Sequence, residues 1–133
     1  MNFLKEAIKF HGHLGPYLIL GLLAGSLGLK KTGAKKYFGL EVKVYGANKK
    51  PKSCLIDGLQ LSTGATYGKG NIQKFAGKDI KIKIHNLIND KEVSLSLSKD
   101  LKKELDCLKG CRDSERFARG LLKRSRKIWL YQA

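Results

Sequence analysis

Alternating apolar and polar residues predict three β-strands. The runs cover residues 40–45, 80–85 and 93–98. In each run every second residue is apolar, which is the period of a strand with one buried face. Asn89 and Asp90 lie between the second and third runs and suit a tight turn, so these two strands are expected to form an antiparallel hairpin.

The first third of the chain predicts two helices. Asn2–Lys9 is a short amphipathic segment, and Gly15 and Pro16 open a second helix, with proline in the first turn where no amide donor is needed. Residues 17–23 are apolar on all sides, which indicates a buried helix. Three glycines would let another backbone approach this helix closely, either within the domain or in a second subunit. They are Gly21, Gly25 and Gly28.

The last third of the chain predicts two more helices. Ser98 can cap a short helix that ends at Leu105, and Asp113 or Ser114 can cap a last helix that reaches about Ile128. A chain of 133 residues fits one domain. The fold class is therefore expected to be α+β, with the whole chain forming a single domain in which an antiparallel sheet packs against helices.

A further helix is expected to begin at Asp57, because Asp57 and Gln60 resemble a capping box, and to end near Gly64 or Gly68. Asp57 is then either a helix cap or an acid–base group, and its spacing favours the cap. Cys54 lies just before this helix, whose N-terminus together with nearby lysines would favour the thiolate. Cys54 is therefore a candidate nucleophile or metal ligand, and the alternative is a small buried residue.

The charge balance predicts an attraction to anions. Lysine and arginine number 27, aspartate and glutamate number 11, and the formal net charge is +16. Such a field attracts nucleic acid, phosphorylated ligands, acidic proteins or an acidic membrane, and it also occurs in proteins without any such partner. The last predicted helix is the best nucleic-acid candidate, but no complete nucleic-acid-binding signature accompanies it, and a solvated basic face is favoured. Its basic residues are Lys123, Arg124, Arg126 and Lys127, and Trp129 and Tyr131 add aromatic side chains beside it.

The cysteine content and the N-terminus favour a cytoplasmic protein. Three cysteines do not form a disulfide framework, and Lys5 and Glu6 interrupt the N-terminus before any apolar run that would suit a signal peptide. Residues 14–29 are too few and too rich in glycine for a membrane span. Cys107 and Cys111 lack the second ligand pair of a zinc finger and are expected to be structural or a labile thiol pair.

Two histidines form a candidate metal-binding turn. His11 and His13 flank Gly12, so both imidazoles can reach one centre, and Cys54 can add a thiolate. Zinc suits such a mixture of nitrogen and sulfur ligands. The alternative is that one histidine packs locally while the other faces solvent. His85 lies in the exposed phase of its strand and is not expected to take part.

A glycine-rich segment after the third helix suggests an anionic ligand. It is not a Walker phosphate loop, because Gly64 and Gly68 are four residues apart and Lys69 is followed by Gly70. Backbone amides in glycine turns nevertheless bind anions. The alternative is a helix end followed by a solvated turn. The candidate side chains are those of Thr63, Thr66, Lys69 and Asn71.

Taken together, these segments resemble the family of the E-type subunit of formylmethanofuran dehydrogenase. That family carries a His-Gly-His-x-Cys-Pro-Gly motif, followed by a cysteine-and-aspartate segment that leads into Gln, Thr-Gly and Gly-Lys-Gly-Asn. The resemblance covers about residues 3–100. The matching residues are His11, Gly12, His13, Pro16, Cys54, Asp57, Gln60, Thr63, Gly64, Thr66, Gly68, Lys69, Gly70 and Asn71.

The resemblance implies an intertwined archaeal homodimer with a cleft around the histidine turn and Cys54. It implies a link to formylmethanofuran metabolism in methanogenesis and the binding of zinc or another divalent transition metal by His11, His13 and Cys54. It further implies catalytic roles for Cys54 and Asp57, and binding of a small anionic or pterin-like substrate. The substrate-binding residues would be Gln60, Thr63, Thr66, Lys69 and Asn71.

The chain departs from the family pattern at two positions and lacks the C-terminal zinc finger of many members. Gly15 stands where the family has a cysteine, and Tyr17 stands where it has a glycine. One thiolate is therefore missing from the expected cleft. The protein is expected to be an oxidoreductase component that associates with other subunits of the dehydrogenase. The alternative is a non-catalytic accessory subunit that docks through helix 15–28 and its basic surface. A nucleic-acid binder is the least favoured alternative.

Overall fold

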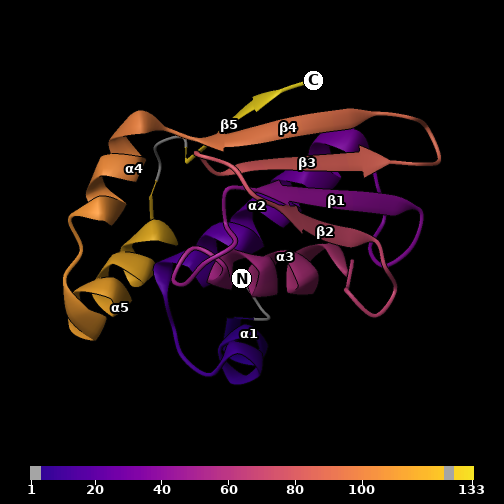
Figure 1. Ribbon diagram of the computed structural model, residues 1–133. Coiled ribbons are helices and arrows are strands. Elements are labelled where there is room, and N and C mark those ends of the chain that lie inside the picture. Colours follow the sequence, from indigo (N-terminus) through magenta and orange to yellow (C-terminus); the bar gives the residue numbers. More distant parts are fainter. Residues whose placement is uncertain (1–3, 125–127) are drawn as a thin grey trace.

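The computed structural model describes residues 4–124 and 128–133 (Figure 1). Within this part of the chain, helices and strands form one α+β domain, as predicted. The helices are α1 (Leu4–His11), α2 (Pro16–Thr32), α3 (Cys54–Thr63), α4 (Lys99–Asp106) and α5 (Gly110–Leu121). The strands are β1 (Leu40–Tyr45), β2 (Ile72–Phe75), β3 (Lys81–Asn86), β4 (Glu92–Leu97) and β5 (Trp129–Gln132).

The strands form one sheet in the order β2-β1-β3-β4-β5 (Figure 1). β1 pairs in parallel with β2, whereas the other neighbouring strands are antiparallel. The sheet is thus mixed, whereas the sequence predicted an antiparallel sheet. The three strands predicted from the alternation are confirmed as β1, β3 and β4. The predicted hairpin is confirmed between β3 and β4. Asp90 takes the left-handed backbone conformation in that hairpin, with φ of 63°.

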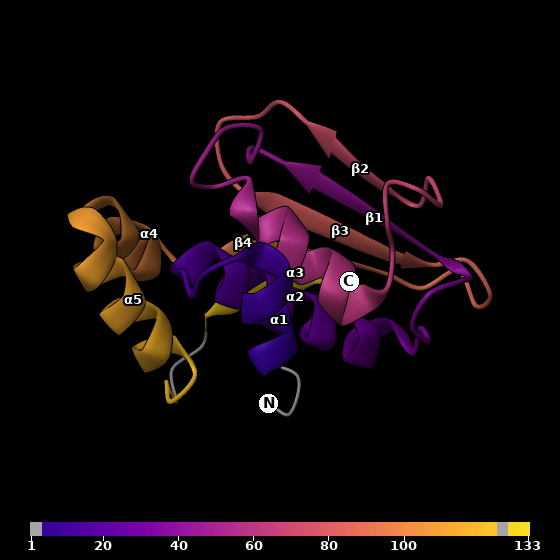
Figure 2. The same ribbon diagram turned by 90° about the horizontal axis from the view of Figure 1, so that it is seen from below.

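Helices α1, α2 and α3 lie on one side of the sheet (Figure 2). The long helix α2 is buried along most of its length, so it forms the centre of the core. A Cβ at Gly21 would lie 2.9 Å from the Cα of Gly58, and one at Gly28 would collide with Ile84 of β3. The glycines of α2 therefore serve close packing inside the domain, which makes this helix unavailable as the docking element that the accessory-subunit alternative assigned to it.

Two helix boundaries differ from the predictions. Helix α3 begins at Cys54, and no side chain caps it, so the predicted cap at Asp57 is wrong. The last helix is shorter than expected, because α5 begins at Gly110 and ends at Leu121. In contrast, Ser98 caps α4 as predicted, and its hydroxyl oxygen accepts a hydrogen bond from the Leu101 amide at 3.3 Å.

The C-terminal segment joins the sheet instead of extending the last helix. Trp129 of β5 is buried and donates from its indole nitrogen to the Leu20 carbonyl at 3.1 Å. Arg124 contacts the carboxylate of Glu104 at 2.6 Å. The predicted basic helix to Ile128 is therefore wrong in its extent, and its predicted residues Arg126 and Lys127 lie outside the described residues. Across the described ranges, no helix is long and apolar enough to cross a membrane.

Candidate functional site

The last residue of α1 is joined to the first turns of α3 by a short hydrogen bond. His11 Nδ1 lies 2.6 Å from Asp57 Oδ2, although the two residues are 46 positions apart in sequence. The His11 side chain is 9% exposed and that of Asp57 is 36% exposed. Because a carboxylate accepts hydrogen bonds, this contact places a proton on Nδ1 of the imidazole. Asp57 therefore orients His11, a role that the sequence left open between cap and acid–base group.

The other ring nitrogen of His11 is left without a partner. Nε2 is buried, and it makes no hydrogen bond to the residues that the structure describes. With the proton held on Nδ1, Nε2 of the neutral ring carries a free lone pair. A buried polar atom without a partner is costly, and such atoms mark places where an ion or ligand binds. His11 Nε2 is thus oriented and available to coordinate.

The glycine between the two histidines lets the turn close. Gly12 has φ of 107°, a conformation that side chains rarely adopt. Its amide donates to the Ile8 carbonyl at 2.7 Å, which ends α1. The rings of His11 and His13 stack with centroids 4.8 Å apart at 29°. The turn therefore holds the two imidazoles in a stack, in which His13 is exposed and the His11 ring is mostly buried.

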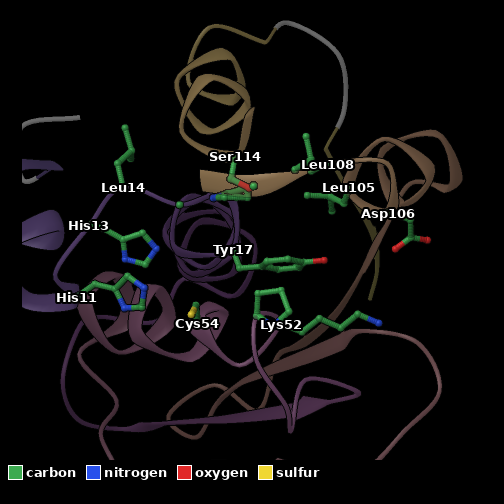
Figure 3. Close-up of a pocket in the computed structure, with 14 residues that line it drawn as sticks. His11, His13, Leu14, Tyr17, Lys52, Cys54, Leu105, Asp106, Leu108 and Ser114 are labelled. Atoms are coloured by element: carbon green, nitrogen blue, oxygen red, sulfur yellow. The ribbon is translucent and has the colours of Figure 1, made fainter. Parts of the chain in front are cut away.

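Cys54 is the first residue of α3 and faces the same pocket as the two histidines (Figure 3). Burial is the main cause that raises the pKa of its thiol, and the Asp57 carboxylate raises it further, while Lys50 acts in the opposite direction. Lys50 therefore favours the thiolate, as expected, but burial and the Asp57 carboxylate outweigh it, and the effect of the helix N-terminus stays a prediction. Cys54 is a protonated thiol at neutral pH unless a cation stabilises its thiolate.

The pocket beside these groups has a volume of about 370 Å³. Its far side comes from α4, from the start of α5 and from the loop before α3, as Figure 3 shows. Tyr17 projects into the pocket, and burial together with the nearby Asp106 carboxylate raises the pKa of its hydroxyl. The lining combines apolar side chains with two opposite charges. It includes Leu14, Tyr17, Lys52, Leu105, Asp106 and Leu108.

The sequence from residue 10 to residue 127 matches the family described as FmdE, molybdenum formylmethanofuran dehydrogenase operon. This match covers most of the chain. The chain belongs to the FmdE family. A stretch of 72 residues, 53% of the chain, is also 31% identical to a protein of Archaeoglobus fulgidus named as a probable S-adenosyl-L-methionine-binding protein. The stretch covers 20% of that protein, so the chain spans about a fifth of that relative's length.

Both positions at which this FmdE chain departs from the expected motif, Gly15 and Tyr17, line the pocket. Gly15 precedes α2 in an extended conformation, with φ of −134°. A Cβ there would lie 3.3 Å from Nε2 of the exposed His13 ring. The backbone at this position thus accommodates a side chain, and a cysteine would place its Cβ beside His13. Gly15 reduces the number of potential ligands without changing the local backbone.

The predicted substrate-binding residues of the glycine-rich segment lie at the other end of α3 from Cys54. The side chain of Gln60 accepts a hydrogen bond from the Tyr67 amide at 3.2 Å, and Asn71 joins the Thr66 amide to the Tyr37 carbonyl. These side chains hold their own loop together. The pocket lining includes none of the predicted set Gln60, Thr63, Thr66, Lys69 and Asn71.

Thr63, the last residue of α3, and Lys69 in the following loop also make contacts within the segment. Thr63 is fully buried, and its hydroxyl donates to the Leu59 carbonyl at 2.6 Å and accepts from the Ala65 amide at 3.1 Å. The ammonium group of Lys69 contacts the Gly64 carbonyl and lies 4.6 Å from the ring centroid of Phe38. The structure therefore gives the segment a structural role, and a role in ligand binding stays a prediction.

The donor atoms in the pocket fit a transition metal in kind, though they do not form a closed ligand set. Within the described residues, no three histidine, cysteine, aspartate or glutamate side chains converge at metal-ligand spacing. His11 Nε2 is nevertheless unpartnered, it has a carboxylate behind it, and a histidine and a thiol line the same pocket. A carboxylate behind a coordinating imidazole is the usual support of a histidine metal ligand.

The wall of the pocket opposite the histidines was not predicted from the sequence. Tyr17, Lys52 and Asp106 were not among the predicted site residues, because each lies in a different element and only the fold brings them together. One signal was available for Tyr17, since a tyrosine in an otherwise apolar buried helix needs a place for its hydroxyl.

Proposed function

We propose that this FmdE protein binds zinc or another divalent transition metal in the pocket between α1 and α3. His11 Nε2 and the Cys54 thiolate would be the principal ligands, and His13 would be the third. The observation that carries the proposal is the buried, unpartnered Nε2 of His11, whose opposite ring nitrogen is fixed by Asp57. A bound metal of this kind supplies a Lewis acid and lowers the pKa of the Cys54 thiol and of any coordinated water.

The chain's own groups support this binding in two ways. Asp57 keeps the proton of His11 on Nδ1, so the coordinating nitrogen stays unprotonated as long as the ring is neutral. The thiol of Cys54 must lose its proton before it binds, so metal loading is expected to release protons and to weaken at acidic pH. The catalytic roles proposed for Cys54 and Asp57 are, respectively, to hold the metal and to position His11.

The pocket is proposed to take a small anionic or pterin-like ligand in formylmethanofuran metabolism. Lys52 supplies a cation, and Tyr17 offers an aromatic surface beside the metal-binding groups. Within one chain, the predicted substrate-binding loop lies at the end of α3 that is far from this pocket. In the proposed cytoplasmic homodimer, the loop of the second subunit would reach the ligand. The similar segment of the Archaeoglobus fulgidus protein makes S-adenosyl-L-methionine a ligand to include in binding assays.

The decisive experiment is metal analysis of untagged protein. We expect about one equivalent of zinc after reconstitution and dialysis, and loss of that metal on His11→Ala or Cys54→Ser. Matched controls are His85→Ala, because His85 also bonds to a carboxylate but is paired at the surface with Asp90, and Cys107→Ser, because Cys107 is exposed. Equal metal content in the His11→Ala variant and in wild type would rule out the proposed site.

A second candidate function is that of an accessory subunit that docks on a formylmethanofuran dehydrogenase. Exposed apolar residues of two adjacent segments support it, because the Leu87 amide donates to the Gly39 carbonyl at 2.9 Å and clustered exposed apolar residues mark protein interaction sites. Comigration with the purified dehydrogenase in gel filtration tests the idea, and Phe38→Ser with Ile88→Ser should abolish it. Phe10→Ser is the matched control. The exposed apolar residues are Tyr37, Phe38, Leu87 and Ile88, which are 55%, 75%, 49% and 86% exposed.

A further inference from the structure

The sheet has a second face that the helices α1, α2 and α3 do not cover (Figure 2). Side chains alternate strictly between the two faces along β1 and β3, and the inward residues of both strands are buried. The other face, which we call the outer sheet face, is formed by the intervening residues. These are Glu41, Lys43, Tyr45, Gln73, Phe75, Lys81, Lys83, His85, Glu92, Ser94, Ser96, Leu130 and Gln132.

The strand register arranges the outer sheet face in rows. In one row Tyr45 lies opposite Phe75 on one side and opposite Lys81 on the other, and the row continues to Ser96. The rings of Tyr45 and Phe75 stack with centroids 5.0 Å apart at 21°. A stacked aromatic pair with one ring 38% exposed at the sheet edge offers an aromatic surface to a planar ligand.

In the neighbouring row, two positively charged side chains lie directly across from each other. Lys43 lies directly across from Lys83, and Lys81 is two residues from Lys83 on the same face. Like charges directly opposite in a sheet are destabilising. Within the described part of the chain, these three lysines take part in no ion pair. The carboxylates of Glu41 and Glu92 lie in the row of His85, farther from the aromatic pair, so the positive charge is in excess at the aromatic end of the face.

A hollow continues the aromatic and basic rows toward β5. It has a volume of about 620 Å³ and is lined by residues of β3, β4 and β5. Its lining includes Lys81, Ser94, Ser96, Leu130 and Gln132. Hydroxyl and amide groups beside an apolar side chain suit the polar edge and the flat face of a nucleobase.

We propose that the outer sheet face binds single-stranded nucleic acid, with phosphates at Lys43, Lys81 and Lys83 and bases on Phe75 and Tyr45. Open sheets that carry aromatic side chains stack successive bases, and lysines beside them follow the backbone phosphates. An acidic protein surface would use the charges but has no need of an exposed aromatic pair. A base can stack on Phe75 only when it is unpaired, so single strands fit this surface better than a duplex.

Fluorescence anisotropy with fluorescein-labelled 15-nucleotide oligo(dT) and oligo(U) tests the proposal. At about 50 mM salt, where phosphate contacts are strong, we expect binding whose affinity falls steeply as salt increases. Lys43→Gln with Lys83→Gln should weaken it and reduce the slope of log affinity against log salt by about 0.7 for each phosphate that the variant no longer neutralises. Phe75→Ala should weaken binding roughly fivefold or more, because a base can no longer stack on the ring.

The matched control is Lys103→Gln with Lys109→Gln, which removes the same charge from exposed positions outside the sheet. It should bind nearly as well as wild type. Equal losses in the two double variants would mean that net charge alone attracts the oligonucleotide, and the proposal would fail. It would also fail if no binding occurs at about 50 mM salt, or if polyglutamate competes equally and Phe75→Ala has no effect. All titrations contain a chelator, so the outcome does not depend on the proposed metal site.

Discussion

Gly21 of α2 and Gly58 of α3 face each other so closely that neither residue leaves room for a side chain. A Cβ at Gly21 would lie 2.9 Å from the Gly58 Cα, and a Cβ at Gly58 would lie 2.8 Å from the Gly21 Cα. Because Cys54 and Asp57 occupy the first turns of α3, this backbone contact sets their position relative to the pocket.

Gly58→Ala is expected to lower the free energy of unfolding by about 1–3 kcal/mol, because the added methyl group would overpack the contact between two helix backbones. Urea denaturation measures the change. The control is Gly120→Ala on α5, where a Cβ would meet nothing within 4 Å. That substitution should stabilise the protein by up to about 1 kcal/mol, since alanine favours the helix. If Gly58→Ala were as stable as wild type, the close contact would be contradicted.

Asp57→Asn is expected to weaken zinc binding roughly 10- to 100-fold, because His11 would lose the carboxylate that fixes its ring and its tautomer. Competition titrations with a chromophoric chelator measure the affinity. Asp90→Asn is the control, since Asp90 makes the corresponding bond to His85 at the surface. Equal affinities for wild type and Asp57→Asn would show that the His11–Asp57 contact does not support a metal ligand.

Metal-free Cys54 is expected to react slowly with iodoacetamide at neutral pH. Burial and the Asp57 carboxylate raise the pKa of its thiol, so the reactive thiolate forms only at higher pH than in a free cysteine. Asp57→Asn removes one of these causes, lowers the pKa and should accelerate alkylation. Mass spectrometry of a Cys107→Ser, Cys111→Ser background follows Cys54 alone. A rate in that background that Asp57→Asn leaves unchanged would contradict the assigned cause.

Gly15→Cys is expected to fold and to increase zinc affinity. The backbone at Gly15 is extended, and an added Cβ would meet only the exposed ring of His13. A thiolate there would add a ligand to the pocket, and zinc favours a fuller set of sulfur and nitrogen ligands. The readout is the cobalt-substituted protein, whose thiolate-to-metal absorption should intensify. Gly15→Ser is the control of similar size without the thiol, and it should leave the absorption unchanged.

The strands that the sequence predicted well are those whose two faces meet different environments. β1 and β3 alternate because one face is buried while the other is exposed or partly exposed. β2 escaped prediction because only Ile72 of its four residues is buried, so it has no period to detect. Its parallel pairing with β1 depends on the α3 connection, which no local pattern reveals.

The candidate site shows the same division between local and distant information. The turn at Gly12 was predictable because the conformation depends on neighbouring residues. Asp57 was assigned to a cap because its true partner, His11, lies 46 positions away and on another helix. The pocket wall formed by Tyr17 and Asp106 could not be predicted either, because these two residues are far apart in the sequence.

Helix α1 is attached to the rest of the domain by few contacts, in which Leu4 and Ile8 pack against the core with partial burial. Ala7 is its one buried residue among those described, and the bond from His11 to Asp57 holds its end. Elements with so little burial open locally at a small fraction of the global unfolding free energy. A metal shared by His11 and Cys54 would therefore act as a staple between α1 and α3. Hydrogen exchange of the α1 amides should slow on metal addition, while exchange of the β3 amides stays unchanged. The local opening of a single helix would therefore report whether the metal is bound.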